Sequence, residues 1–175
     1  MTSSLYKSEL TIPYLCGLVA YLMLKHGLKL ATAESCTGGL IAAACTDLAG
    51  SSAWFERGFV TYSNAAKTEL LGVDAGLIER EGAVSEAVAR AMALGALAHS
   101  HAQVALAVTG VAGPSGGSAA KPVGTVCFGL AVAGQVLTEQ RHFDGNRAAV
   151  RTASVRHALG RLVALLGSAP LPTGH

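Results

Sequence analysis

Charged side chains are scarce in this chain. Asp, Glu, Lys and Arg make up 14% of its 175 residues, against about a quarter in typical domains, and hydrophobic residues make up 51%. The net charge of +2 is not gathered into a basic or acidic block, which argues against nucleic acid or a membrane surface as a partner. So little charge predicts a homo-oligomer, a dimer or larger, with an apolar interface that the alanine-rich stretch 85–98 is suited to provide.

Metal-binding patterns are also missing. The four cysteines, at positions 16, 36, 45 and 127, show no C-x-x-C or other zinc-type spacing. The six histidines form no H-x-x-x-H pair with a carboxylate partner. We therefore expect reduced thiols in a cytoplasmic protein that needs no metal and no cofactor.

An apolar run near the N-terminus lacks the form of a signal peptide or a membrane span. Ile12–Leu24 is followed by Ala31-Thr32-Ala33, which resembles a signal-peptidase site, but three basic residues stand between the two. The run also contains Pro13 and is too short to span a bilayer comfortably. We expect residues 8–26 to form a helix packed on the core.

Strand and helix patterns alternate along the rest of the chain. The predicted strands are 28–33, 58–62, 104–108, 123–132 and 135–143, and the further predicted helices are 38–48, 65–71, 74–80, 85–101 and 146–167. Gly134 joins the last two strands into a hairpin. The order predicts an α/β fold, a single three-layer α/β/α domain with a mixed sheet over residues 1–167, and a flexible tail over 168–175.

Three predicted strands end in polar or glycine-rich clusters. These clusters are Glu34–Gly39, then Tyr62-Ser63-Asn64 with Lys67 one helical turn further on, and Thr109–Gly117. Each alone is compatible with an ordinary turn or cap, and Asn64 is a good cap for the helix that follows. In an open α/β sheet, however, ligands bind beyond the carboxyl ends of the strands. Together the clusters predict a binding site at that edge.

The first cluster has the pattern of a strand, a tight turn and a helix start. Such a turn exposes the Ser35 side chain at the end of the sheet and directs unpaired backbone N–H groups, near Thr37, Gly38 and Gly39, toward a ligand. These features suit a nucleophile with an oxyanion hole, or a cradle for phosphate. A serine that only caps the helix is the simpler alternative.

Lysine is the remaining candidate for a general base, since no histidine has the neighbours of a Ser–His–Asp triad. Burial lowers the pKa of a lysine by up to several units, and a neutral Lys67 amine is able to deprotonate a serine. The alternative is a surface lysine on an amphipathic turn. Cys36 is a second candidate nucleophile, but without a histidine partner it is better interpreted as a small packed residue.

Two arginines stand four residues apart at the start of the last predicted helix. Arg147 and Arg151 share one face of this helix, although positive charge at a helix N-terminus opposes the helix dipole. An anion is therefore expected beside them. A ligand phosphate held by the planar guanidinium groups is one candidate, and an acidic residue such as Asp144 is the other.

The motifs, taken in order, resemble those of one family, the C-terminal domain of the competence- and damage-inducible CinA proteins. The resemblance covers roughly residues 10–166. Its main motifs are Thr32-Ala33-Glu34-Ser35-Cys36-Thr37-Gly38-Gly39-Leu40, Gly58-Phe59-Val60-Thr61-Tyr62-Ser63-Asn64-Ala65-Ala66-Lys67, Val108-Thr109-Gly110-Val111-Ala112-Gly113-Pro114-Ser115-Gly116-Gly117 and Phe143-Asp144-Gly145-Asn146-Arg147.

The resemblance implies an enzyme of pyridine nucleotide recycling, because stand-alone family members are nicotinamide-nucleotide amidohydrolases. They hydrolyse nicotinamide mononucleotide to nicotinic acid mononucleotide and ammonia. The family's serine, lysine and tyrosine fall on Ser35, Lys67 and Tyr62, with the tyrosine orienting the lysine or the substrate amide. The resemblance also places Thr109 and the glycine loop after it at the nucleotide site. Together with the residues argued above, the expected substrate contacts are Thr37, Gly38, Gly39, Asn64, Thr109, Gly110, Gly113, Arg147 and Arg151. The rival hypotheses are a non-catalytic nucleotide- or partner-binding module and a serine–lysine esterase or peptidase.

Overall fold

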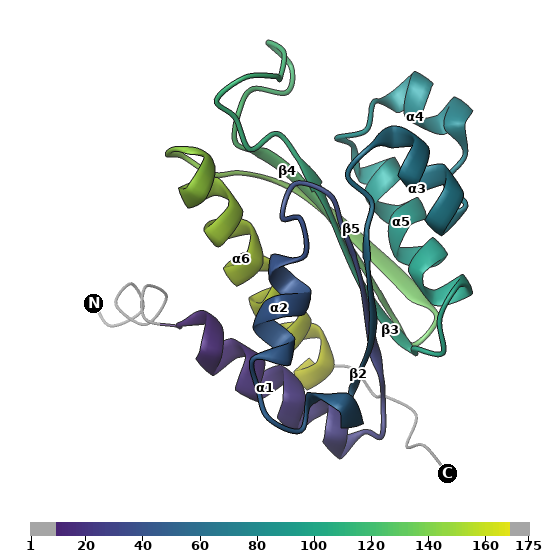
Figure 1. The fold of residues 1–175 in the computed structure, drawn as a ribbon, viewed down its shortest axis with the longest axis vertical. Coiled ribbons are helices and arrows are strands. Elements are labelled where there is room, and N and C mark those ends of the chain that lie inside the picture. The colour runs from purple at the N-terminus through teal and green to yellow at the C-terminus, as the bar shows by residue number, and fades with distance from the viewer. Residues whose placement is uncertain (1–9, 169–175) are drawn as a thin grey trace.

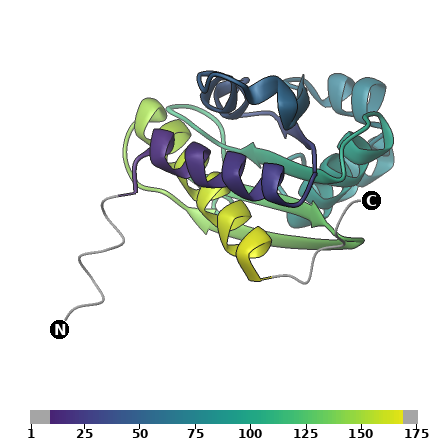
Figure 2. The same cartoon turned by 90° about the horizontal axis from the view of Figure 1, so that it is seen from below.

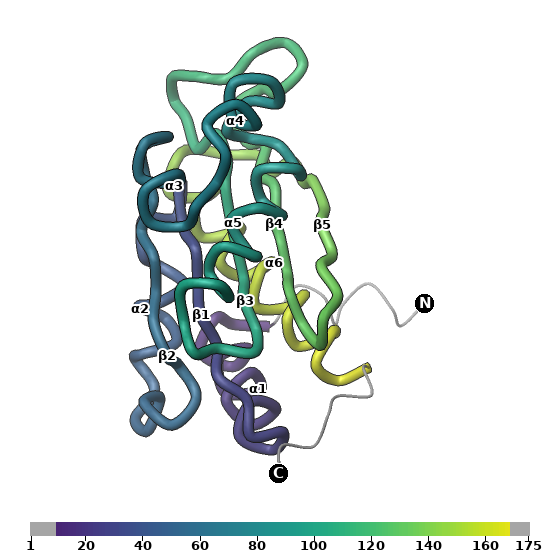
Figure 3. The backbone as a smooth tube through the Cα atoms, turned by 90° about the vertical axis from the view of Figure 1, so that its right-hand side faces the viewer, coloured from purple at the N-terminus to yellow at the C-terminus, as the bar shows by residue number. Residues whose placement is uncertain are grey.

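A five-stranded mixed sheet forms the centre of the computed structural model, which describes residues 10–168. It lies in the order β2-β1-β3-β4-β5, with β1 parallel to β2 and β3, and with β3, β4 and β5 antiparallel in turn (Figure 3). The predicted mixed sheet and the hairpin at Gly134 are confirmed. The strands are β1 (Leu30–Glu34), β2 (Phe55–Val60), β3 (Val104–Gly110), β4 (Thr125–Val132) and β5 (Gln135–His142).

Helices cover both faces of this sheet and give the three predicted layers. Figure 1 shows the two groups of helices on opposite sides of the strands, and Figure 2 shows α1 beside α6. A short 3-10 turn, Ser51–Ala53, precedes β2 and was not predicted. One face carries α1 (Ile12–Lys25), α2 (Leu40–Thr46) and α6 (Arg147–Ser168), and the other carries α3 (Asn64–Leu71), α4 (Ala75–Glu81) and α5 (Glu86–Ala98).

The two faces of the sheet present side chains of different size. Large residues such as Leu106 point toward α1, α2 and α6, whereas the face toward α5 carries alanines such as Ala31. Small side chains let α5 approach closely, and a Cβ on Gly129 of β4 would lie only 2.4 Å from the backbone oxygen of Ala89. The close packing of α5 brings the segment before it, residues 82–85, to the carboxyl end of β3.

Two element boundaries differ from the expectation for identifiable reasons. The first helix begins at Ile12 rather than near residue 8, because Thr11 is extended and caps it. β2 occupies Phe55–Val60 rather than 58–62. This strand lies at the edge of the sheet, where charged residues are tolerated, so its first half lacks an apolar pattern.

The start of α3 and the end of α6 also differ slightly from the prediction. Ser63 caps α3 by accepting a hydrogen bond from the Ala66 N–H, so Asn64 is the first helical residue and not the predicted cap. α6 continues to Ser168, and the rest of the predicted tail, 169–175, lies outside the described residues. Within residues 10–168, no helix is long and apolar enough to cross a membrane.

Candidate active site

The carboxyl ends of β1, β2 and β3 meet at one edge of the sheet, where a pocket of about 230 Å³ opens. The loop between β3 and β4 projects at this edge, at the top of Figures 1 and 3. Seven of the predicted site residues line the pocket, whereas Thr37, Gly38, Gly39, Gly113 and Arg151 do not. The complete lining is Ser35, Cys36, Tyr62, Asn64, Lys67, Ala83, Val84, Thr109, Gly110, Ala112 and Arg147.

Ser35 and Lys67 form a buried hydrogen-bonded pair in this pocket. Ser35 directly follows β1, and Lys67 lies in the first turns of α3, which the chain enters after β2. The Nζ atom of Lys67 is 3.1 Å from Oγ of Ser35 and 3.0 Å from the carbonyl oxygen of Thr61. Lys67 is only 1% exposed, which rules out the interpretation as a surface lysine. None of the ion pairs formed within residues 10–168 involves it.

The surroundings of Lys67 favour its neutral form. Burial lowers the pKa of the Lys67 amine, and only a negative charge on Cys36 would oppose this. That charge is absent near neutral pH, because burial raises the pKa of the Cys36 thiol to about 12. The same shift argues against Cys36 as the nucleophile, since the thiolate is the reactive form. A neutral amine beside a serine hydroxyl has the geometry of a general base and its nucleophile.

Glu34 holds the turn that carries Ser35. Its buried carboxylate accepts hydrogen bonds from Oγ1 of Thr37 at 2.7 Å and from the N–H groups of Ile41 at 2.9 Å and Ala42 at 3.0 Å. These bonds tie the end of β1 to the first turn of α2 and satisfy N–H groups that have no partner within the helix. This role of Glu34 was not predicted from the sequence, although an acid just before a short helix was a usable signal.

Arg151 and two glycines complete the same turn. The Arg151 guanidinium donates to the carbonyl oxygens of Cys36 and Thr37, each at 3.2 Å. Gly38 and Gly39 adopt φ angles of +59° and +99°, which residues with a Cβ rarely take. These predicted substrate contacts therefore shape the turn beside the pocket, and the Thr37 hydroxyl is bonded to the glutamate described above.

Arg147 connects two segments at the pocket. Its Nη2 donates to the hydroxyl of Tyr62 at 2.8 Å, and its Nη1 donates to the carbonyl oxygen of Gly113 at 2.9 Å. Asp144, the acidic partner considered from the sequence, instead lies 3.4 Å from His142. The Tyr62 side chain is 61% exposed, so it stands at the mouth of the pocket and not in the core.

The carboxyl end of β3 helps to shape the pocket. The Thr109 hydroxyl donates to the carbonyl oxygen of Ala83 at 2.8 Å, which brings Ala83 and Val84 into the lining, a contact that no local pattern predicted. A Cβ on Gly110 would lie 3.1 Å from the sulfur of Cys36, so glycine keeps this side open. Among residues 10–168, no group of three or more His, Cys, Asp or Glu side chains is placed to hold a metal ion.

The family model of the CinA C-terminal domain matches residues 15–166. The chain belongs to the CinA C-terminal domain family. It is 66% identical over 120 residues to the nicotinamide-nucleotide amidohydrolase PncC of Enterobacter agglomerans, a match covering 68% of this chain and 73% of that protein. It is 52% identical over 138 residues to the protein of the same name from Escherichia coli strain K12, which covers 78% and 84% of the two chains.

A solved structure supports the same assignment. The competence damage-inducible protein A of Klebsiella pneumoniae superposes with a TM-score of 0.88 at 40% identity, covering 90% of this chain and 98% of that one. The α/β fold and the family resemblance drawn from the motifs are both confirmed. The segment matched by the family model includes every residue that lines the pocket.

Proposed function

We propose that this protein is an amidohydrolase that converts nicotinamide mononucleotide to nicotinic acid mononucleotide and ammonia. The observation that carries the proposal is the buried contact of 3.1 Å between Nζ of Lys67 and Oγ of Ser35 in a pocket at the sheet edge. The relatives from E. agglomerans and E. coli, both named nicotinamide-nucleotide amidohydrolase, supply the substrate class.

Ser35 is the nucleophile and Lys67 is the general base in this mechanism. The neutral Lys67 amine takes the Ser35 proton while Oγ bonds to the carboxamide carbon, which gives a tetrahedral intermediate. Lys67 then gives this proton to the amide nitrogen, the C–N bond breaks and ammonia leaves. Water attacks the resulting ester of Ser35, with Lys67 accepting a proton from the water and returning it to Oγ, and the carboxylate product is released.

The turn after β1 provides donors for the negative oxygen of the intermediate. The Gly38 N–H is already bonded to the carbonyl oxygen of Ser35. In the described part of the chain, the N–H groups of Thr37 and Gly39 have no acceptor, and we assign them to the oxyanion. Tyr62 stands at the pocket mouth and orients the substrate amide.

Arg147 is the proposed partner of the substrate phosphate. Of the two arginines considered, Arg147 lines the pocket, and its present acceptors are two neutral oxygens that a charged phosphate would outcompete. Arg151 uses its donors on carbonyl oxygens of the turn, so it positions the backbone around Ser35. Asn64, Thr109 and the glycine-rich loop are assigned to the nucleotide.

Release of ammonia from nicotinamide mononucleotide by the purified protein tests the proposal. Wild-type protein should produce ammonia and nicotinic acid mononucleotide in equal amounts, and Ser35→Ala should produce neither. A binding module of the same fold would bind the nucleotide without turnover. A serine–lysine esterase or peptidase would hydrolyse test esters and leave the amide intact. Either outcome contradicts the proposal.

We further propose that the protein is a cytoplasmic homo-oligomer. Its four cysteines are all buried free thiols, as expected in a reducing compartment. Cell fractionation tests the location, and light scattering of the purified protein tests the assembly.

A further inference from the structure

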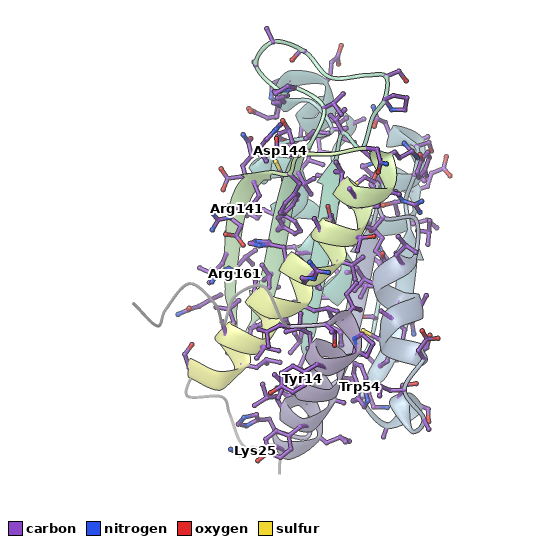
Figure 4. All side chains as sticks on the ribbon, turned by 90° about the vertical axis from the view of Figure 1, so that its left-hand side faces the viewer. Tyr14, Lys25, Trp54, Arg141, Asp144 and Arg161 are labelled. Atoms are coloured by element: carbon purple, nitrogen blue, oxygen red, sulfur yellow. The ribbon has the colours of Figure 1, made fainter. Side chains whose placement is uncertain are left out.

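A second pocket lies away from the active site, where the start of α1 and the middle of α6 meet the end of β5. Its volume is about 560 Å³, and it shares no lining residue with the active-site pocket. Figure 4 views the molecule from this side and shows Arg141 and Arg161 on it. The lining is Leu10, Leu15, Arg141, Phe143, Ala153, Arg156, His157, Gly160 and Arg161.

Positive charge dominates this second pocket. Three arginines line it, and the lining contains no carboxylate. Glu139 on β5 contacts the same group: it accepts from Arg141 at 3.0 Å and from Arg161 at 2.9 Å, and it lies 2.8 Å from Nε2 of His157. One carboxylate against three guanidinium groups leaves an excess of two positive charges, even with a neutral histidine.

Glu139 keeps its negative charge and orders this cluster. Burial raises the pKa of the Glu139 carboxyl, but the hydrogen bond and charge of His157 and the charges of Arg161 and Arg141 outweigh it, so the pKa lies below its usual value. The carboxylate thus pairs with both Arg141 and Arg161, which come from two different elements. Arg156 lies on the same helix as Arg161, and its side chain is exposed at the pocket.

Apolar and aromatic groups form the rest of the lining. The ring of His157 packs 4.8 Å from the ring of Phe128 and 5.8 Å from that of Phe143, measured between centroids. Phe143 lines the pocket together with Leu10 and Leu15. A cavity of several hundred Å³ that combines apolar walls with a few fixed charged groups is typical of small-molecule sites.

We propose that this second pocket binds a phosphate monoester attached to a planar ring, the chemistry of a nucleoside monophosphate. A phosphate monoester carries a charge of about −1.5 to −2 near neutral pH, which matches the excess positive charge of the cluster. Guanidinium groups bind phosphate oxygens through paired N–H donors. The pocket is larger than a phosphate alone requires, and Phe143, Leu10 and Leu15 offer an apolar surface to the ring.

Calorimetric titration with adenosine 5′-monophosphate tests the proposal. Wild-type protein and Arg147→Ala, which lacks the proposed phosphate partner in the active site, should both bind it at this site. Arg156→Gln should weaken binding by about tenfold or more, the scale of one charged hydrogen bond, and Arg156→Gln with Arg161→Gln by more. Arg80→Gln, on α4, is the matched control and should bind as the wild type does.

We expect Arg156→Gln to fold as the wild type does, because Arg156 takes no part in the hydrogen bonds of Glu139. Adenosine, which lacks the phosphate, should bind at least about tenfold more weakly than the monophosphate. Unchanged binding in both arginine variants, loss of binding in Arg147→Ala alone, or equal affinity for adenosine would overturn the proposal. A lower molecular mass of Arg156→Gln in light scattering would also overturn it, since the pocket would then be an interface between copies.

Discussion

The Lys67 amine has two oxygen neighbours, Oγ of Ser35 and the carbonyl oxygen of Thr61. A neutral amine has two N–H groups and one lone pair, so it can donate to the carbonyl and accept from the serine hydroxyl at the same time. An ammonium group would have to donate to both and would remain buried without a counter-charge, which is costly. The geometry around Lys67 therefore suits the protonation state that a base requires.

Substitution of Lys67 distinguishes a role as general base from a purely structural role. Lys67→Arg should be nearly as inactive as Lys67→Ala, because a guanidinium keeps its proton, and each should lower kcat/KM by about 10²–10⁴. Ser35→Ala should abolish turnover and leave nucleotide binding almost unchanged, since only a hydroxyl is removed. Steady-state kinetics and titration measure these effects, with the exposed Lys25→Arg as control. Substantial activity in Lys67→Arg would exclude the base role.

The lowered pKa of Lys67 also makes folding stability depend on pH. An unfolded lysine has a pKa of about 10.4. Between the folded value and this one, the unfolded chain binds a proton that the folded chain does not, so the free energy of unfolding increases with pH across that window. We expect Tm of the wild type to rise relative to Lys67→Met as the pH is raised toward the unfolded value of about 10.4. Parallel thermal melts check this, and a constant difference in Tm would contradict it.

Arg147 offers a test of phosphate recognition. Loss of a hydrogen bond to a charged group costs about 1.5–3 kcal/mol, so Arg147→Ala should weaken binding of nicotinamide mononucleotide by that amount. Nicotinamide riboside, which lacks the phosphate, should be a poor substrate of the wild type. Turnover and titration with both compounds measure the effect. Equal turnover of the riboside and the mononucleotide would remove the phosphate role from this residue.

Local patterns predicted some site residues and missed others for a physical reason. Ser35 and Lys67 stand at strand ends, and strand ends are visible in a sequence because an apolar run stops there. The hydrogen bond between Arg147 and Tyr62 joins residues 85 positions apart, and no local pattern encodes it. The role of Glu34 was not predicted, because its three hydrogen-bond partners become clear only when the turn closes around its carboxylate.

At the scale of elements, burial decided which strands could be predicted. β3 is covered by helices on both faces and has a continuous apolar run, so its position was predicted closely. β2 lies at the sheet edge and contains Glu56 and Arg57, which pair with each other at 2.7 Å. Its pairing with β1 also shifts register after Leu30. Because of the exposed edge and this register shift, the first three residues of β2 were not predicted as part of a strand.

The packing of α5 against α3 depends on one glycine. A Cβ on Gly95 would lie 2.1 Å from the carbonyl oxygen of Leu71, the last residue of the helix that carries Lys67. Gly95→Ala should therefore destabilise the fold by about 1–3 kcal/mol and also reduce activity, because α3 must shift. Gly160→Ala, where a Cβ meets nothing within 4 Å, is the control and should stabilise by about 0.5–1 kcal/mol. Denaturant unfolding measures both, and equal stabilities would contradict the prediction.

At the scale of the whole molecule, α1 exposes three large apolar side chains, more than any other helix within residues 10–168. It buries Leu15 and Val19 against the core but exposes Tyr14, Tyr21 and Leu24 at more than half of their surface. These three lie seven and three residues apart, so they form one stripe along the outer side of the helix. α5, which the sequence favoured as an interface, instead packs its alanine-rich face on the sheet.

We therefore expect the proposed homo-oligomer to form through the α1 stripe of Tyr14, Tyr21 and Leu24. Light scattering at micromolar concentration should show a dimer or larger for the wild type. Tyr21→Glu combined with Leu24→Glu should lower the mass, because burying two carboxylates in an apolar contact is unfavourable. Leu94→Glu, at a similarly exposed leucine of α5, is the control and should leave the mass unchanged. A monomeric wild type would contradict oligomerisation itself, whereas a wild-type mass in the double variant would exclude α1 as the interface.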